Sequence, residues 1–183
     1  MRSTKPRFVV LAALVVVFTA GVGCADEGSP DEAQMQSLGK SAFFDANLSI
    51  NRNRSCSSCH APSTGWVVPE DEVNAARAVY EGSVPDTFGD RKPMSAAYST
   101  QAPIFHMAEP GVFVGGNFWD GRATGEHLDS PAADQAQGPL LNPVEQALPD
   151  PACVVLRVTT ATYSSTTYSD VWGSPEITWP ADA

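Results

Sequence analysis

The first regular pattern of apolar and polar positions lies in residues 30–45. Met35, Leu38, Ala42 and Phe43 recur at helical spacing, and most residues between them are polar or small. A serine followed by proline opens the stretch, which is typical of a helix N-terminus because proline fits the first turn. The pattern therefore predicts one amphipathic helix with a single apolar face.

Three further helices are expected downstream, separated by irregular segments. The first is a short helix that begins at residue 56 and ends near Pro62. Residues 73–80 are rich in alanine and follow three acidic residues, and an aspartate–proline pair at 150–151 opens a helix whose valines share one side. The β-branched run 159–167 weakens helix propensity and carries no prediction. Residues 82–103 and 108–116 predict long loops, and such loops in a compact domain usually surround a ligand or a functional site.

The N-terminal 23 residues have the organisation of a secretory signal. Basic residues precede an apolar run, Phe8–Ala20, which is too short to span a bilayer and is followed by small residues. These small residues resemble a lipobox, which predicts cleavage before Cys24 and lipidation of its thiol; simple signal-peptidase cleavage nearby is the alternative. Residues 24–30 then form a short tether, so we expect a periplasmic lipoprotein anchored to the membrane.

Charge adds to this picture. The 183-residue chain has 11 lysines and arginines against 21 aspartates and glutamates, which gives a formal net charge of −10. Residues 1–23 hold three of the basic residues and none of the acidic ones, so the remainder has 8 against 21, or −13. Such a surface repels nucleic acid and suits a basic redox partner. The length favours one main domain.

The strongest chemical signal is Cys56-Ser57-Ser58-Cys59-His60, the attachment sequence of c-type haem. Thiols three positions apart reach the two vinyl groups on one edge of a porphyrin and form thioethers. The histidine that follows places an imidazole nitrogen under the iron as the proximal ligand. The motif occurs once, so we predict one covalent haem c per chain.

Two other uses of this motif remain open at this point. A zinc site would need a second pair of ligands at suitable spacing, and downstream only Cys153, His106 and His127 remain. A thioredoxin-like redox pair would need a βαβ context, and the sequence does not alternate in that way. We interpret Cys153 as a small buried apolar residue.

Ordered motifs along residues 38–173 resemble the bacterial dihaem cytochrome c peroxidases. They begin before the haem motif, continue through an aromatic and acidic signature, and end near residue 145. In order, the motifs outside the haem sequence are Leu38-Gly39-Lys40, Phe43-Phe44-Asp45, Leu48-Ser49, Ser95-Ala96-Ala97-Tyr98, Phe118-Trp119-Asp120-Gly121-Arg122-Ala123, Gln135-Ala136-Gln137-Gly138-Pro139 and Asn142-Pro143-Val144-Glu145.

The resemblance implies an all-α, cytochrome-c-like haem domain with long irregular loops over residues 31–173. In that family the N-terminal domain holds the haem where hydrogen peroxide is reduced, with electrons from a redox-protein donor that pass through a second haem domain. Carried over by motif, His60 is the proximal iron ligand and Trp119 bridges the two domains. Gln135 and Glu145 are the distal polar pair, and Glu145 would move a proton between the two peroxide oxygens.

The chain departs from the family pattern at several positions. It has one CxxCH motif instead of two, and we interpret residues 174–183 as the start of a missing second domain. Lys92 replaces an asparagine that the family associates with calcium, which puts a calcium site in doubt. No histidine stands near Val84, where the family supplies a distal ligand, so His106 is the candidate sixth ligand, with Met107 beside it. The open alternatives are a half-buried, hydrogen-bonded His106 and a Met107 that only packs.

Two classes of function remain. The first is the peroxide-reducing half of a peroxidase, working alone or with a separate second chain. The second is a single-haem electron-transfer cytochrome c or an inactive fragment, in which a stable pair of axial ligands would hold the iron. The related dihaem enzymes that oxidise protein tryptophans rank third, because they also need the second haem.

Overall fold

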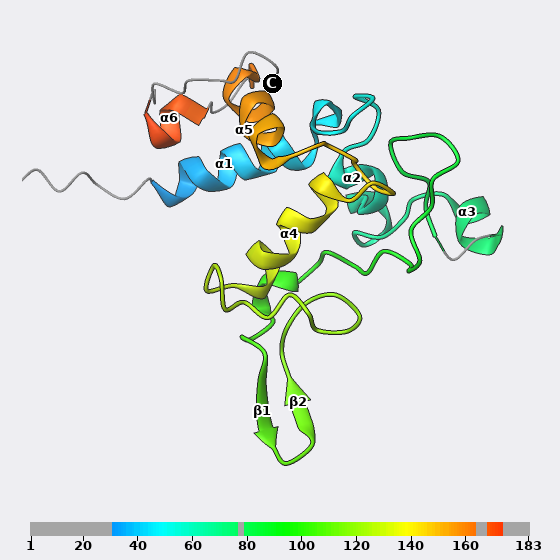
Figure 1. Ribbon diagram of the computed structural model, residues 1–183, viewed down its shortest axis with the longest axis vertical. Helices are drawn as coiled ribbons and strands as arrows, with labels where there is room; N and C mark the ends of the chain where they lie inside the picture. The colour runs from blue at the N-terminus through cyan, green and yellow to red at the C-terminus, as the bar shows by residue number, and fades with distance from the viewer. Residues whose placement is uncertain (1–30, 77–78, 164–167, 174–183) are drawn as a thin grey trace, which may run out of the picture.

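The computed structural model describes residues 31–76, 79–163 and 168–173 (Figure 1). Within these ranges the chain forms α-helices, short 3₁₀ helices and one two-stranded sheet. In order, they are α1 Glu32–Phe43, η1 Ala46–Leu48, α2 Cys56–Cys59, η2 Pro62–Thr64, α3 Asp71–Ala76, η3 Ser99–Gln101, β1 His106–Glu109, β2 Val112–Val114, α4 Pro131–Leu141, α5 Pro151–Thr160 and α6 Tyr168–Trp172. The signal segment 1–23, the tether 24–30 and the second-domain start 174–183 lie outside the described residues and stay predictions.

Helix α1 confirms the first predicted helix. Asp31 caps its N-terminus, and the Asp31 carboxylate accepts a hydrogen bond from the Ala33 amide at 3.1 Å. Glu32 in the first turn and Lys40 in the last turn have the charges that the helix dipole favours. Leu38 is the buried residue of this helix. Helix α6 packs against α1.

Helix α5 confirms the helix expected at the aspartate–proline pair. The Asp150 carboxylate accepts from the Cys153 amide at 2.8 Å, and proline occupies the first turn. The Arg157 guanidinium near its C-terminal end donates to the backbone carbonyls of Asn47 and Ser49, which ties α5 to the segment that leads toward the haem motif. Val155, expected on the apolar side, is exposed.

Helix α3 is shorter than the predicted helix 73–80. It runs from Asp71 to Ala76, and residues 77–78 lie outside the described part of the chain. Tyr80 is not helical, and its hydroxyl donates to the Glu70 carboxylate at 2.9 Å across the base of the helix. The predicted helix therefore does not extend to Tyr80.

The expectation of an all-α fold is wrong for residues 106–114. Strands β1 and β2 form an antiparallel hairpin in which His106 pairs with Val114 and Met107 with Phe113. Gly111 turns the chain with a φ of +80°, a conformation that glycine adopts without strain. Figure 1 shows the hairpin projecting from one end of the molecule. A loop was expected over residues 108–116, and strands of four and three residues have only a weak signal in a sequence.

The apolar core is small and is divided among several elements. Its buried members are Leu38, Leu48, Ala61, Val68, Ala123, Leu148 and Val171. Figure 1 shows α1, α5 and α6 gathered at one end of the molecule, with α4 crossing the middle. None of the helices in the described ranges is long and apolar enough to cross a membrane. Two serines, Ser49 and Ser83, are fully buried, so polar side chains hold much of the interior together.

Candidate haem site

The two cysteines of the haem motif are the first and last residues of the one-turn helix α2. Residues three apart on a helix lie on the same face, so Cys56 and Cys59 face the same side. Both are half-buried free thiols. The Ser55 amide donates to the Ser58 hydroxyl at 3.1 Å, and the His60 amide donates to the Cys56 carbonyl at 3.0 Å. These bonds fix the short helix at both ends.

His60 is held by the loop that follows it. The His60 Nδ1 atom lies 3.2 Å from the carbonyl oxygen of Trp66, a contact in which Nδ1 carries the proton and Nε2 keeps a lone pair. Burial lowers the pKa of His60 below 6.5, so the ring is neutral near pH 7. A neutral imidazole with its second nitrogen bonded to a carbonyl is the usual form of a histidine metal ligand.

The surroundings of the thiols fit thioether attachment better than zinc binding. Burial raises the pKa of Cys56, and it raises the pKa of Cys59 to about 12. Zinc binds thiolates, which this environment disfavours. In the described ranges, no three histidine, cysteine or carboxylate side chains cluster as a metal site would require. The donor set of two thiols and one neutral imidazole therefore fits a covalently attached haem.

Glu145 lies close enough to this motif for its charge to act on both thiols. The Glu145 carboxylate is among the causes that raise the pKa of Cys56 and the pKa of Cys59. The Glu145 side chain is half-buried, and its Oε1 atom accepts a hydrogen bond from the Asn142 side-chain amide at 2.8 Å. Burial raises the pKa of Glu145 above 4.5, while the bond from Asn142 and the charge of Arg122 oppose the shift.

Gln135 lies in the middle of α4, on the same continuous stretch of chain as Glu145. Ser130 caps α4 and accepts from the Ala133 amide at 3.4 Å. The Asn142 amide ends the helix by donating to the Gly138 carbonyl at 3.1 Å. The side chain of Gln135 is half-buried. Its role as a distal amide stays a prediction.

Trp119 lies on the surface, with 63% of its area exposed. Its indole Nε1–H donates to the Lys92 carbonyl at 2.9 Å. The Arg122 guanidinium pairs with the Asp120 carboxylate at 2.8 Å and lies over the Phe118 ring at 3.8 Å. Arg122 is thus held by a local ion pair, and the bridging role of Trp119 stays a prediction.

His106 begins strand β1, is exposed, and has its Nδ1 atom 2.8 Å from the Ile104 carbonyl. Met107 beside it has 57% of its area exposed. In Figure 1 the hairpin that carries both residues points away from α2. The structure thus does not bring these side chains next to the haem motif, and a distal-ligand role for His106 stays a prediction.

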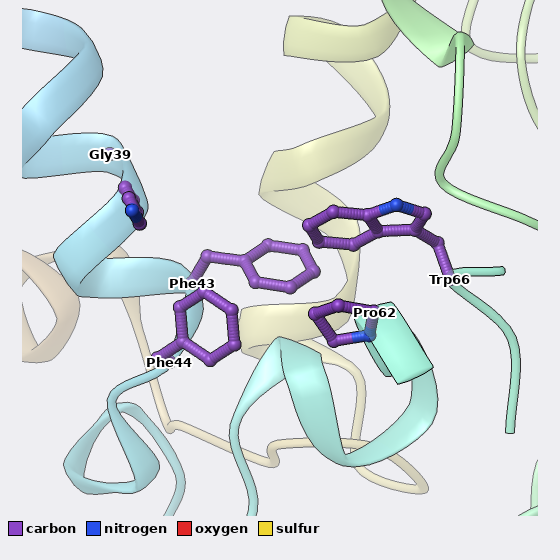
Figure 2. Close-up of a pocket in the computed structure, with 6 residues that line it drawn as sticks. Gly39, Phe43, Phe44, Pro62 and Trp66 are labelled. Carbon is purple, nitrogen blue, oxygen red and sulfur yellow. The ribbon is translucent and has the colours of Figure 1, made fainter. Parts of the chain in front are cut away.

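An apolar pocket lies between the end of α1 and the loop after the haem motif (Figure 2). Its volume is about 560 Å³, and Phe43, Phe44, Pro62 and Trp66 form its apolar walls. The rings of Phe43 and Trp66 meet edge to face at 5.7 Å. Phe43 was expected on the apolar face of a helix and as part of the Phe43-Phe44-Asp45 motif, and neither pattern predicts a pocket. The paired phenylalanines were the available signal, but Trp66 reaches them only through the folded loop.

Comparisons with known proteins identify the family of the chain. A model of the di-haem cytochrome c peroxidase family matches residues 33–182. The methylamine utilization protein MauG of Paracoccus denitrificans is 37% identical over 152 residues, which cover 83% of this chain and 37% of that protein. The cytochrome c551 peroxidase of Pseudomonas aeruginosa is 31% identical over 123 residues, which cover 64% of this chain and 27% of that protein.

A solved structure gives the same result. The diheme peroxidase BthA from Burkholderia thailandensis superposes with a TM-score of 0.61 at 33% identity, and the match covers 72% of this chain and 30% of BthA. The chain spans less than two fifths of the length of the relatives named here. The family match over residues 33–182 covers most of the chain. The chain belongs to the di-haem cytochrome c peroxidase family.

Proposed function

We propose that this chain is an exported c-type haem protein that reduces hydrogen peroxide. Cys56 and Cys59 would hold one haem c through thioethers, and His60 would be the proximal ligand of its iron. The observation that carries the proposal is the position of Glu145 near the haem motif. Its carboxyl group is half-buried and has a raised pKa, and its charge raises the pKa of both Cys56 and Cys59. A carboxyl group so placed is a candidate acid–base residue.

Bound haem iron would supply the centre at which peroxide is held and electrons are delivered. The role of the chain is proton management in the reaction of H2O2 with two protons and two electrons to give two waters. Glu145 in its ionised form takes a proton from one peroxide oxygen and returns it to the other as the O–O bond breaks. The Asn142 amide, 2.8 Å from Oε1, orients the carboxylate, and Gln135 provides a second polar group.

The two electrons would come from a redox-protein donor. We place Trp119 on the electron path because its exposed indole lies on the surface, where a partner domain or protein can reach it. With one attachment motif in this sequence, we expect one covalent haem on this chain. The acidic surface favours a basic donor.

Export and anchoring complete the proposal. The pattern of residues 1–23 supports secretion to the periplasm, and Cys24 is the proposed lipid attachment site. Replacing Cys24 with serine should then move the protein from the membrane fraction to the soluble fraction. Wild-type protein that is already soluble and carries no lipid would contradict the anchor.

The 37% sequence identity to the methylamine utilization protein MauG supports a second candidate function, a role in methylamine utilization. The same iron site and the same Glu145 would serve there, but the electrons would come from a different reductant. Oxidation of reduced cytochrome c by haem-loaded protein and peroxide would favour the first candidate. Consumption of peroxide only with another reductant would favour the second.

The test of the proposed chemistry is a single-turnover experiment. Haem-loaded Glu145→Gln protein is mixed with peroxide in a stopped-flow instrument, and the absorbance change of the haem is followed. Because a proton-transfer residue contributes about 10²–10⁴-fold, the rate should fall by that factor. Glu109→Gln, on the exposed hairpin, is the matched control and should react like wild type. Equal rates in all three proteins would remove Glu145 from the mechanism.

A further inference from the structure

Ser83 is fully buried and binds the loop that leads into the haem motif. Its hydroxyl accepts a hydrogen bond from the Asn51 amide at 3.1 Å and donates one to the Asn53 side-chain oxygen at 2.7 Å. Its carbonyl accepts from the side-chain amides of Asn51 and Asn53, both at 3.0 Å. Four hydrogen bonds thus fix Ser83 to a loop that ends at Ser55, the N-cap of α2.

The same short segment contacts the backbone of Glu145. The Ser83 amide donates to the Glu145 carbonyl at 2.6 Å. Next to it, Gly82 packs so closely that an added Cβ would lie 2.4 Å from the Val144 carbonyl oxygen and 3.0 Å from that of Glu145. These are backbone atoms, which cannot rotate aside as a side chain can. Gly82 does not have a left-handed backbone, so space is what requires glycine here.

Arg54 anchors this segment from the haem side. Its Nε atom donates to the Gly82 carbonyl at 3.3 Å, and its guanidinium lies 4.9 Å from the centre of the Tyr80 ring. Arg54 stands two residues before Cys56. The segment 82–83 is therefore bound on one side to the chain that enters the haem motif and on the other side to Glu145.

We propose that Gly82 and Ser83 form a positioning element that sets the place of Glu145 relative to the haem motif. This inference rests on the proposed function, because it assigns these residues a part in peroxide reduction through Glu145. The element acts through the backbone: a shift of residues 82–83 moves the Glu145 carbonyl and with it the carboxylate. Misplacement of a reacting group by about 1 Å can cost on the order of 100-fold in rate.

The test compares two glycine-to-alanine substitutions in the same loop. Gly82→Ala forces the backbone of residues 144–145 to move, whereas Gly89→Ala meets nothing within 4 Å and has an ordinary φ. Both variants keep Cys56, Cys59 and His60, so mass spectrometry should find the haem attached in each. In single-turnover stopped-flow with peroxide, Gly82→Ala should be slower than wild type by about tenfold to 100-fold. Gly89→Ala should be unchanged.

A double variant separates positioning from general damage. If Gly82 acts through Glu145, then adding Gly82→Ala to Glu145→Gln should slow the reaction no further than Glu145→Gln alone. A full additional slowing would show that Gly82 acts on another part of the site, and a normal rate for haem-loaded Gly82→Ala would show that it positions nothing. Either result overturns the inference. A Glu145→Gln protein with the wild-type rate would instead overturn the proposed function itself.

A second variant covers the case in which Gly82→Ala does not accumulate. Ser83→Ala adds no atoms but removes both hydroxyl hydrogen bonds, and it should slow the same reaction in haem-loaded protein. If neither variant accumulates with haem attached, residues 82–83 serve folding and the positioning role is refuted. Normal rates in haem-loaded Ser83→Ala would refute it equally.

Discussion

The loops around the haem motif and the hairpin of β1 and β2 show that regular secondary structure and burial are independent. Residues 49–55, 82–83 and 142–148 contain almost no regular structure, yet they include Ser49, Ser83, Gln146 and Leu148, each at most 4% exposed. The hairpin is regular, yet every residue of both strands is exposed.

The difference comes from where the polar backbone groups find partners. In the hairpin they pair with the opposite strand, which needs no tertiary contact. In the loops, serine and asparagine side chains bind backbone groups that would otherwise be buried without a partner. Ser49 Oγ, for example, accepts from the amides of Asn53 and Arg54 and donates to the Ala46 carbonyl. Irregular chain can thus form the rigid part of the molecule.

The largest expected effect concerns packing. Leu148→Ala in the loops removes a side chain that is 2% exposed and should lower the free energy of unfolding by about 2–5 kcal/mol. Met107→Ala, in the hairpin, removes a side chain of similar size that is 57% exposed and should change it by no more than about 0.5 kcal/mol. Denaturant unfolding of the haem-loaded proteins measures both. Equal losses would mean that the hairpin is buried in solution.

Ser49→Ala tests the hydrogen bonds of the loops. It leaves the amides of Asn53 and Arg54 without their acceptor, the hydroxyl of the fully buried Ser49, which should cost about 1–3 kcal/mol. Ser95→Ala is the control and should cost less, because the hydroxyl that it removes is exposed; this hydroxyl donates to the Gly65 carbonyl and accepts from the Ala97 amide. A harmless Ser49→Ala would show that these loops are held mainly by apolar contacts.

The pH dependence of the single-turnover rate should report Glu145. Burial raises its pKa above 4.5, and the ionised form is the one that accepts a proton from peroxide. The rate should therefore fall as pH drops below this raised pKa, by about tenfold per pH unit once the group is mostly protonated. Stopped-flow rates of haem-loaded protein across this pH range give the profile. In Glu145→Gln the rate should no longer fall with pH in this way. A fall that persists in this variant would come from the titration of another group.

The smallest expected effect concerns Gln146. Its side chain is 4% exposed, and neither polar atom has a hydrogen-bond partner within the described part of the chain. A buried polar group without a partner costs roughly 1–3 kcal/mol, so Gln146→Met should raise the melting temperature of the haem-loaded protein by a few degrees. A lower melting temperature would indicate that the amide binds water or another group in the folded protein.

The sequence by itself determined the features that depend on nearby residues. Cys56, Cys59 and His60 act within one turn of helix, so their spacing was enough to predict haem attachment. Helices α1 and α5 begin at local caps. The aspartate–proline pair revealed the Asp150 cap of α5, whereas the cap of α1 is Asp31 and not the serine that the sequence suggested. The family motifs also named Glu145 before any contact was known.

Only the tertiary structure decided the rest. The bonds of Ser83 join residues 30 and 32 positions apart, and the closeness of Glu145 to the haem cysteines spans a longer separation still. No local pattern encodes such pairs, because their partners meet only after the chain has closed its loops. The hairpin was missed for a different reason: two short strands have a weak signal and marginal stability on their own. His106 was a candidate iron ligand from the sequence. It lies on this hairpin, which points away from α2.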